Sequence, residues 1–222
     1  MAGWWKGILK DIREKTAHMD RKQKLEYIAA YYWYHILFVV LGALFILLLI
    51  RHLFFGNPPT VFNCVMINQA IDFERDARLG EDFAGNLGVS PEQISIDSNY
   101  VFSYVGKELE GANESSYDKF FFRLGGGELD AAIIPESFYQ YCMDLEYTFV
   151  DLETMLTEEE KARWQAELVE NNGTYNGIYV ENLPLMKYLN QEEEDPILLV
   201  FFQKEKNVEA NRSFLEFAIN DE

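Results

Sequence analysis

Histidine is scarce in this chain, and its distribution excludes several kinds of catalytic site. The three histidines, His18, His35 and His52, all lie in the first quarter of the 222 residues. Residues 53–222 therefore cannot form a His-based catalytic triad or a zinc site that contains histidine. The chain also lacks the Gly-x-Ser-x-Gly, P-loop and dinucleotide-binding motifs. We therefore expect a non-enzymatic protein with no cofactor and no resident metal.

Basic residues are also few, and acidic residues outnumber them. The sequence has 19 Lys and Arg against 37 Asp and Glu, which gives a formal net charge of −18. This charge favours solubility and argues against nucleic acid or an anionic membrane surface as the partner of the acidic part. One acidic run lies in a predicted loop, and we interpret it as a solvated surface in preference to a calcium site. It consists of Glu192, Glu193, Glu194 and Asp195.

One long apolar run, ILFVVLGALFILLLI at 36–50, contains no charged residue. A bilayer core of about 30 Å requires roughly 20 apolar residues, so the aromatic flanks 31–34 and 54–55 must extend the run. We predict a transmembrane helix at 34–55. A cleaved signal peptide is the alternative, but its apolar core would begin within the first ten to twenty residues. The following Gly56-Asn57-Pro58-Pro59 also lacks a small-x-small cleavage pattern, so we expect the helix to be retained.

The charges on the two sides of the apolar run predict its orientation. Residues 1–33 hold seven Lys and Arg against four Asp and Glu, whereas residues 52–222 hold eleven against thirty-three. Only basic residues close to the run carry the inference, and these are Arg21, Lys22 and Lys24. We expect a single-pass protein of the cell membrane with a cytoplasmic N-terminus and an extracytoplasmic C-terminal domain.

Residues 1–33 form the predicted cytoplasmic part, made of amphipathic and juxtamembrane helices. Four apolar residues recur on one helical face, while basic residues lie elsewhere, which is typical of a helix at a membrane interface. They are Trp4, Ile8, Leu9 and Ile12. We favour plain contact with the lipid bilayer over docking to a protein partner, although the same residues would serve both. Asp20 and Gln23 have capping-box spacing and predict the start of a second helix that runs into the membrane.

After a linker at 56–60, residues 61–222 have the pattern of one extracytoplasmic α/β domain. Runs that are apolar on both faces predict buried strands at 61–67, 129–134 and 196–203, and 175–180 is also extended. One or two further strands are expected within 93–104, separated by a turn at Asp97-Ser98-Asn99. The order of elements implies a mixed sheet with helices on both faces.

Helical periodicity and capping residues predict the helices of this domain at 74–87, 116–124, 135–141 and 207–219. Ser115 is the expected N-cap of the second of these, and Pro135 is the expected first residue of the third. Thr157 and Glu160 form a capping box for another helix, which places Trp164 and Leu168 on one side.

Several segments are similar to a known family. The stretch GGGELDAAIIPESFYQYCMDLEYTFVDLETML at 125–156 resembles a segment of type 2 periplasmic solute-binding proteins, in which a helix leads through a glycine turn into G-x-x-D and a buried strand. NGIYVENLPLMKYL at 176–189, the last strand and helix, and KLEYIAAYYWYHILFVV at 24–40 are similar to membrane-tethered binding-protein-like domains of uncharacterised single-pass proteins in Gram-positive bacteria. The resemblance implies a reduced periplasmic-binding-protein fold.

Polar residues follow two of the predicted buried strands. Asn68 and Gln69 come after the strand at 61–67, and Pro135, Glu136 and Ser137 come after the strand at 129–134. If both strands are parallel, these residues share the carboxyl edge at which open α/β sheets bind ligands. Strand exit and helix capping without a ligand is the alternative, and it is the more common use of such residues.

The two cysteines, Cys64 in a predicted strand and Cys142 at a predicted helix end, both follow the membrane segment, where disulfides can form. Both also lie in apolar surroundings that suit a reduced thiol. A disulfide and two free thiols therefore both remain open.

The tether, the family resemblance and the missing catalytic motifs together predict a function. We expect an accessory subunit of a membrane complex, with a transporter permease such as that of an ABC transporter as its partner. The alternative is a receptor that captures a small solute or peptide at the carboxyl edge, near Asn68 and Glu136.

Overall fold

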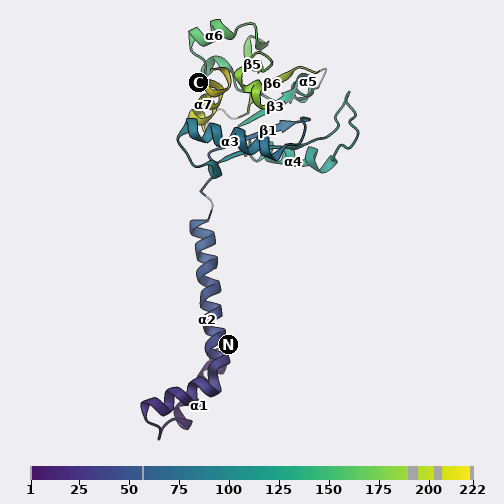
Figure 1. The fold of residues 1–222 in the computed structure, drawn as a ribbon. Helices are drawn as coiled ribbons and strands as arrows, with labels where there is room; N and C mark the ends of the chain where they lie inside the picture. Colours follow the sequence, from purple (N-terminus) through teal and green to yellow (C-terminus); the bar gives the residue numbers. More distant parts are fainter. Residues whose placement is uncertain (1, 57, 190–194, 203–206, 221–222) are drawn as a thin grey trace. The chain divides into compact units, whose positions relative to one another are not determined.

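The computed structural model describes the whole chain except residues 1, 57, 190–194, 203–206 and 221–222 (Figure 1). It divides into two compact units, Met1–Asn57 and Pro58–Glu222. The first unit is helical, and the second is a mixed α/β domain. The boundary between them lies inside the linker that the sequence predicts at 56–60.

The first unit consists of two helices, α1 (Ala2–Lys15) and α2 (Arg21–Phe55). The predicted capping box is present at the start of α2, where the backbone N–H of Gln23 donates to Asp20 Oδ1 at 2.8 Å. Residues Arg21–Leu53 are long and apolar enough to cross a membrane. The side chains of Trp4, Ile8 and Leu9, on which the amphipathic pattern rests, lie outside the described residues.

A polar contact joins the two helices of this unit. The hydroxyl of Tyr32 on α2 donates to the carboxylate of Asp11 on α1, and Lys15 Nζ lies 3.0 Å from the same carboxylate. Thr16, in the turn between the helices, is buried and donates to the carbonyl of Ile12 at 2.6 Å. The segment before the apolar run is therefore a helical hairpin.

The second unit is built on a six-stranded sheet with the order β2-β1-β3-β6-β5-β4. Its strands are β1 (Phe62–Ile67), β2 (Ile94–Tyr100), β3 (Ala131–Pro135), β4 (Leu168–Asn171), β5 (Thr174–Tyr179) and β6 (Ile197–Phe201). Strand β1 is parallel to both β2 and β3, whereas β6 runs antiparallel to β3 and to β5, and β4 runs antiparallel to β5. The sheet is mixed, as predicted.

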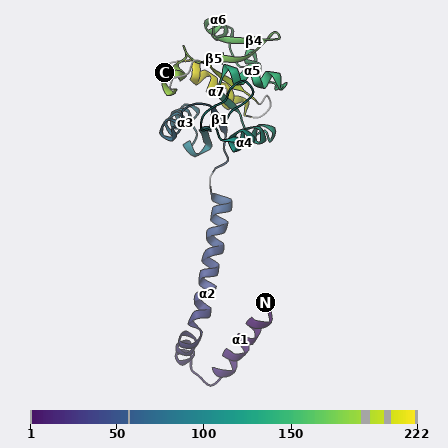
Figure 2. The same cartoon turned by 90° about the vertical axis from the view of Figure 1, so that its right-hand side faces the viewer.

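Helices cover both faces of this sheet. One face carries α3 (Phe73–Leu87) and α7 (Val208–Ile219), with a first core around Phe62, Phe83 and Phe214. The other face carries α4 (Glu114–Gly125) and α5 (Glu136–Asp144), with a second core around Phe102, Phe120 and Phe138. Figure 2 shows α3 and α4 on opposite sides of β1. The alternation of side chains along β1 supplies both cores.

The predicted turn at Asp97-Ser98-Asn99 is wrong. These residues belong to β2, which continues through them to Tyr100. Ser98 is fully buried, and its backbone N–H and Oγ both donate to Asp76 Oδ2 on α3. A carboxylate from a neighbouring helix thus satisfies the polar groups that otherwise favour a turn.

Three smaller predictions also need correction. Asn113, not Ser115, caps α4, and the backbone N–H of Ser115 donates to Asn113 Oδ1. Pro135 ends β3 and is the N-cap of α5, so the helix begins one residue later than expected. The helix with the Thr157 capping box, α6 (Glu158–Trp164), ends before Leu168, which begins β4 instead.

Short 3-10 helices complete the domain: η1 (Pro91–Gln93), η2 (Leu152–Thr154) and η3 (Pro184–Tyr188). The connections after β1 and β3 matter most for a ligand site. The chain leaves β1 toward α3 on the first core's face and leaves β3 toward α5 on the second core's face. Neighbouring parallel strands whose connections diverge in this way form a topological switch point, the usual place of a ligand crevice in open α/β sheets.

Candidate functional site

The switch point brings the two predicted polar loops to one edge of the sheet, because β1 and β3 are parallel. Asn68 follows β1 in a left-handed conformation, with φ of 54°. Its backbone N–H donates to the carbonyl of Tyr100 at 2.9 Å, and its Oδ1 accepts from the N–H of Phe102 at 3.0 Å. Asn68 thereby ties the loop after β1 to the segment that leaves β2.

Two buried amide groups at this loop lack acceptors. Asn68 and Gln69 are 4% and 3% exposed. Within the part of the chain that the structure describes, neither Asn68 Nδ2 nor Gln69 Nε2 has a hydrogen-bond partner. A buried donor left in this state typically costs about 1–3 kcal/mol. These amides are therefore the groups at the switch point with unused capacity to donate to a ligand.

The loop after β3 is held by contacts from three other segments. The N–H of Glu136 donates to the carbonyl of Pro196 at 2.7 Å, and its carboxylate accepts from the Tyr179 hydroxyl at 2.8 Å. Burial, together with this hydrogen bond, raises the pKa of Tyr179 to about 12. The N–H of Ser137 donates to Asp195 Oδ1 at 3.1 Å, and its hydroxyl donates to Oδ2 of the same carboxylate.

Tyr104 and Lys107, which the sequence analysis missed, complete this cluster. Tyr104 Oη lies 2.6 Å from Ser137 Oγ, and Lys107 Nζ donates to Asp195 Oδ2 at 2.8 Å. Burial alone would raise the pKa of Asp195, but the hydrogen bonds from Lys107 and Ser137 outweigh it and leave that pKa below its usual value. Burial raises the pKa of Tyr104, although its bond to Ser137 opposes the change.

Asp195 itself departs from the predicted solvated surface, since its side chain is only 16% exposed. The rest of that run, Glu192, Glu193 and Glu194, lies outside the described residues. No local signal distinguishes Asp195 from these neighbours. Its role depends on Lys107, which is 88 residues away in the sequence.

The segment from Phe102 to Tyr104 lies between the two predicted loops and joins them. Phe102 bonds to Asn68 on one side, and Tyr104 bonds to Ser137 on the other. Asn68 and Ser137 are thus brought into one network, whereas Gln69 and Glu136 make separate contacts or none. The network offers amide donors, an ammonium group and a carboxylate, a set that can hold a polar solute.

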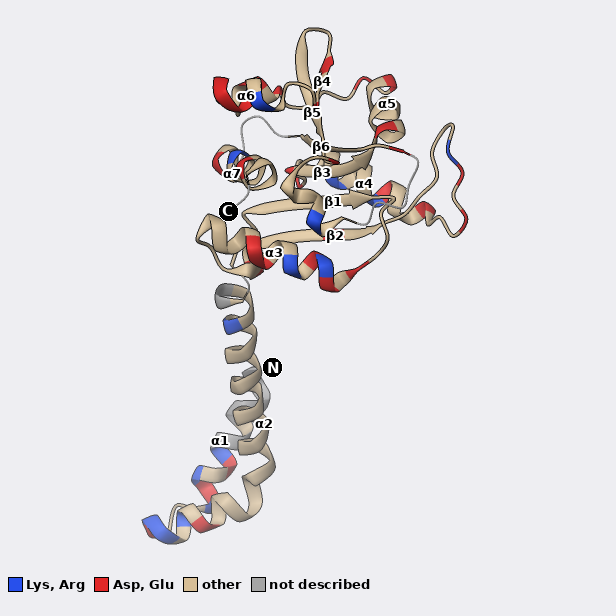
Figure 3. Ribbon diagram, turned by 45° about the horizontal axis from the view of Figure 1, so that its top comes forward, with Lys and Arg blue, Asp and Glu red and all other residues tan. Residues whose placement is uncertain are grey.

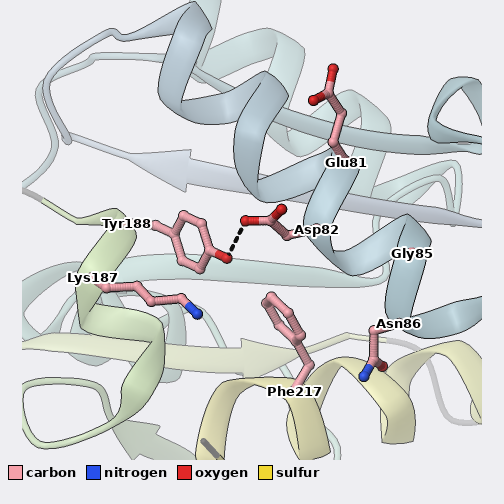
Figure 4. Close-up of a pocket in the computed structure, with 7 residues that line it drawn as sticks. All are labelled: Glu81, Asp82, Gly85, Asn86, Lys187, Tyr188 and Phe217. Carbon is pink, nitrogen blue, oxygen red and sulfur yellow. Dashed lines mark hydrogen bonds between the residues drawn. The ribbon is translucent and has the colours of Figure 1, made fainter. Parts of the chain in front are cut away.

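A hollow of about 370 Å³ lies between α3, η3 and α7 (Figure 4). Asp82 points toward Tyr188 and accepts from its hydroxyl at 2.6 Å, while Glu81 points away from it (Figure 4). Lys187 Nζ lies 5.0 Å from the centre of the Tyr188 ring and 5.9 Å from that of Phe217. These contacts join the three elements, so we assign the hollow a structural role.

Another hollow, of about 480 Å³, lies at the opposite, amino edge of β1 and β3. The guanidinium of Arg123 donates to the Tyr100 hydroxyl at 2.7 Å and lies 3.3 Å from Glu128. The buried carboxylate of Asp130 accepts from the N–H of Asn63 at 2.9 Å and from Asn207 Nδ2 at 2.8 Å. The polar groups of this hollow hold β1, β3 and the start of α7 together.

Cys64 and Cys142 are both free and buried. Cys64 belongs to the first core and Cys142 to the second, so the sheet separates them. Of the two alternatives that the sequence left open, the structure has two free thiols. Burial raises the pKa of Cys142 to about 12 and also raises the pKa of Cys64, and neither thiol is therefore poised for reaction.

Among the described residues, no group of three or more His, Cys, Asp or Glu side chains could hold a metal ion. The candidate site is the switch point, with the polar network of Asn68, Tyr104, Lys107, Ser137 and Asp195 and the unpartnered amide of Gln69. Comparisons of the chain with protein-family models, with curated proteins and with solved structures find no match.

Proposed function

We propose that this protein is a membrane-anchored, non-enzymatic module that serves as an accessory subunit of a membrane complex such as an ABC transporter. Helix α2 anchors it in the lipid bilayer, and the α/β domain, with its likeness to type 2 solute-binding proteins, is extracytoplasmic. Figure 3 shows Lys and Arg together with Asp and Glu on α1, α3 and α6, and acidic residues alone on α5. The basic residues next to the apolar run, Arg21, Lys22 and Lys24, support a cytoplasmic N-terminus.

The observation that carries the proposal is the shortness of the tether. Helix α2 ends at Phe55. The carbonyl of Pro59 already accepts from Gln93 Nε2 at 3.4 Å, and the N–H of Val61 donates to the carbonyl of Gln93 at 2.8 Å. At about 3.6 Å per residue, the chain can separate Phe55 from Pro59 by no more than roughly 15 Å. A domain held so close to its anchor suits a fixed partner in the membrane better than a shuttling receptor.

Purification of the tagged full chain in a mild detergent tests the proposal. We expect one membrane protein to be recovered with it in a constant stoichiometric ratio. A variant with twenty Gly and Ser residues inserted after Gly56 keeps the Pro59 contact, so its fold should be intact. Its recovery of the partner should fall, because a longer tether lowers the effective concentration of the domain at the partner. Repeated recovery of the chain alone would contradict the accessory role.

A second candidate function, a receptor for a small solute or peptide, is favoured by the buried amides of Asn68 and Gln69. Both are donors without acceptors at the switch point, where a ligand carbonyl or carboxylate would satisfy them. A thermal-shift screen of amino acids, peptides, sugars and polyamines tests this function. A ligand at 100 times its Kd stabilises the fold by about 2.7 kcal/mol. A ligand that raises the melting temperature of the wild type but not of Gln69→Leu would support the receptor function. If no compound in the screen raises the melting temperature, the result counts against it.

A further inference from the structure

Strand β2 forms one edge of the sheet, and part of its outer backbone is open to pairing. The carbonyl of Gln93 accepts from Val61, so it faces β1, whereas the N–H of Ser98 faces away and donates to Asp76. Because successive residues of a strand point their backbone groups to alternate sides, the N–H and C=O of Ile96 also face away from β1. The N–H of Ile94 already donates to the carbonyl of Pro91, and Asp76 occupies the edge at Ser98. The outer edge is thus available from the carbonyl of Ile94 to Ile96.

A groove of about 590 Å³ runs beside this edge, between β2 and helix α3. Ile94 and Ile96 line it from the strand, and Ala77 and Gly80 line it from the helix. Phe73 stands at its rim with 68% of its surface exposed. An apolar floor beside an open strand edge is the arrangement in which extended peptides bind by adding a strand.

The exposed charged residues that line the groove are of one sign. Glu81 and Glu92 line it and are exposed, and none of its lining residues is Lys or Arg. The third lining carboxylate, Asp76, is already paired with Arg75 and Ser98. The exposed carboxylates of Glu81 and Glu92 complement a positively charged occupant and disfavour an acidic one.

We propose that this groove is a docking site for an extended, basic segment of the membrane partner, which adds to the β2 edge. The segment pairs with the carbonyl of Ile94 and with the N–H and C=O of Ile96, places alternate apolar side chains on the groove floor, and directs Lys or Arg toward Glu81 and Glu92. The inference rests on the proposed accessory function, because it names the chemistry by which the partner is held.

The test measures binding of a fluorescein-labelled acetyl-KVKVTVK-amide peptide to the full chain in lipid nanodiscs by fluorescence anisotropy. Ala77→Arg puts a large cation on the exposed helix wall of the groove, and we expect it to weaken binding about tenfold or more through like-charge repulsion. Ala162→Arg, the same change at an exposed position of α6, is the matched control and should bind like the wild type. A peptide with Glu in place of each Lys should bind about tenfold more weakly or not at all.

Equal peptide affinity in Ala77→Arg and Ala162→Arg would overturn the proposal. Dimerisation of the chain that Ala77→Arg abolishes, without peptide binding, would also overturn it and would identify a second copy as the occupant. If the purified complex contains a partner whose recovery is unchanged by Ala77→Arg, the accessory function stands and the groove is not its docking site. If the peptide binds as expected but no partner is recovered, the groove stands and the accessory function fails.

Discussion

Asp76 on α3 accepts two hydrogen bonds from Ser98 on β2, one from the backbone N–H at 2.8 Å and one from Oγ at 2.6 Å. The other carboxylate oxygen accepts from Nε and Nη2 of Arg75, at 3.1 and 3.0 Å. All three side chains are buried. This cluster joins the first helix of the α/β domain to the edge of its sheet, so it should matter strongly for stability.

We expect Asp76→Ala to lower the free energy of unfolding by about 3–5 kcal/mol, because it leaves the Arg75 guanidinium buried without its partner. Urea unfolding of the full chain in detergent, followed by circular dichroism, measures the change. Arg212→Ala breaks an exposed ion pair with Glu216 and should cost less than about 1 kcal/mol. If Asp76→Ala lowers the free energy of unfolding as little as Arg212→Ala does, the stabilising role assigned to Asp76 is contradicted.

Two glycines should respond to alanine in opposite directions. Gly80 lies inside α3, and a Cβ there would make ordinary contacts with Ile96 and Ile94 at 3.7 and 3.9 Å. Gly80→Ala should therefore stabilise the domain by about 0.5–1 kcal/mol. Gly88 caps the same helix with φ of 72°, where alanine is strained, so Gly88→Ala should destabilise it. If urea unfolding shows that both substitutions change the free energy of unfolding in the same direction, the different roles assigned to Gly80 and Gly88 are refuted.

Because both free thiols are buried, we expect them to react slowly with thiol reagents in the native protein. Cys64 and Cys142 are each 1% exposed. A maleimide should label neither thiol within minutes at pH 7 and both once the chain is unfolded in guanidinium chloride. Electrophoretic mobility without reductant should equal mobility with it. Labelling that is blocked until a reductant is added to the unfolded chain would reveal a disulfide.

The lowered pKa of Asp195 predicts a dependence of stability on pH. Because the folded-state pKa lies below the unfolded value of about 3.9, the contribution of this carboxylate is present above that value and is lost as the pH falls through the folded pKa. The stability difference between wild type and Asp195→Asn should therefore be constant above about pH 5 and shrink below about pH 4. Asp118→Asn, at an exposed position of α4, is the control. A difference that grows on acidification would be the opposite of this expectation.

Local patterns in the sequence were sufficient for most of the secondary structure. Buried strands such as 61–67 are apolar on both faces, and the capping boxes of Asp20 and Thr157 use residues three apart. Signals of this kind depend on neighbours within one or two helical turns, so they are visible without the fold. The apolar run at 36–50 likewise predicts a helix from consecutive residues alone.

The tertiary structure alone decided four features, each of which depends on a partner far away in the chain. Strand β2 continues through Ser98 because Asp76, 22 residues earlier, satisfies its polar groups. Asp195 is held by Lys107, 88 residues away, and Leu168 begins a strand because β5 is there to pair with it. The cysteines stay apart because β1 and α5 place them on opposite faces of the sheet. Short-range patterns thus suffice to show which segments become helices and strands, while long-range hydrogen bonds and packing set where these elements end and which polar groups meet at the switch point.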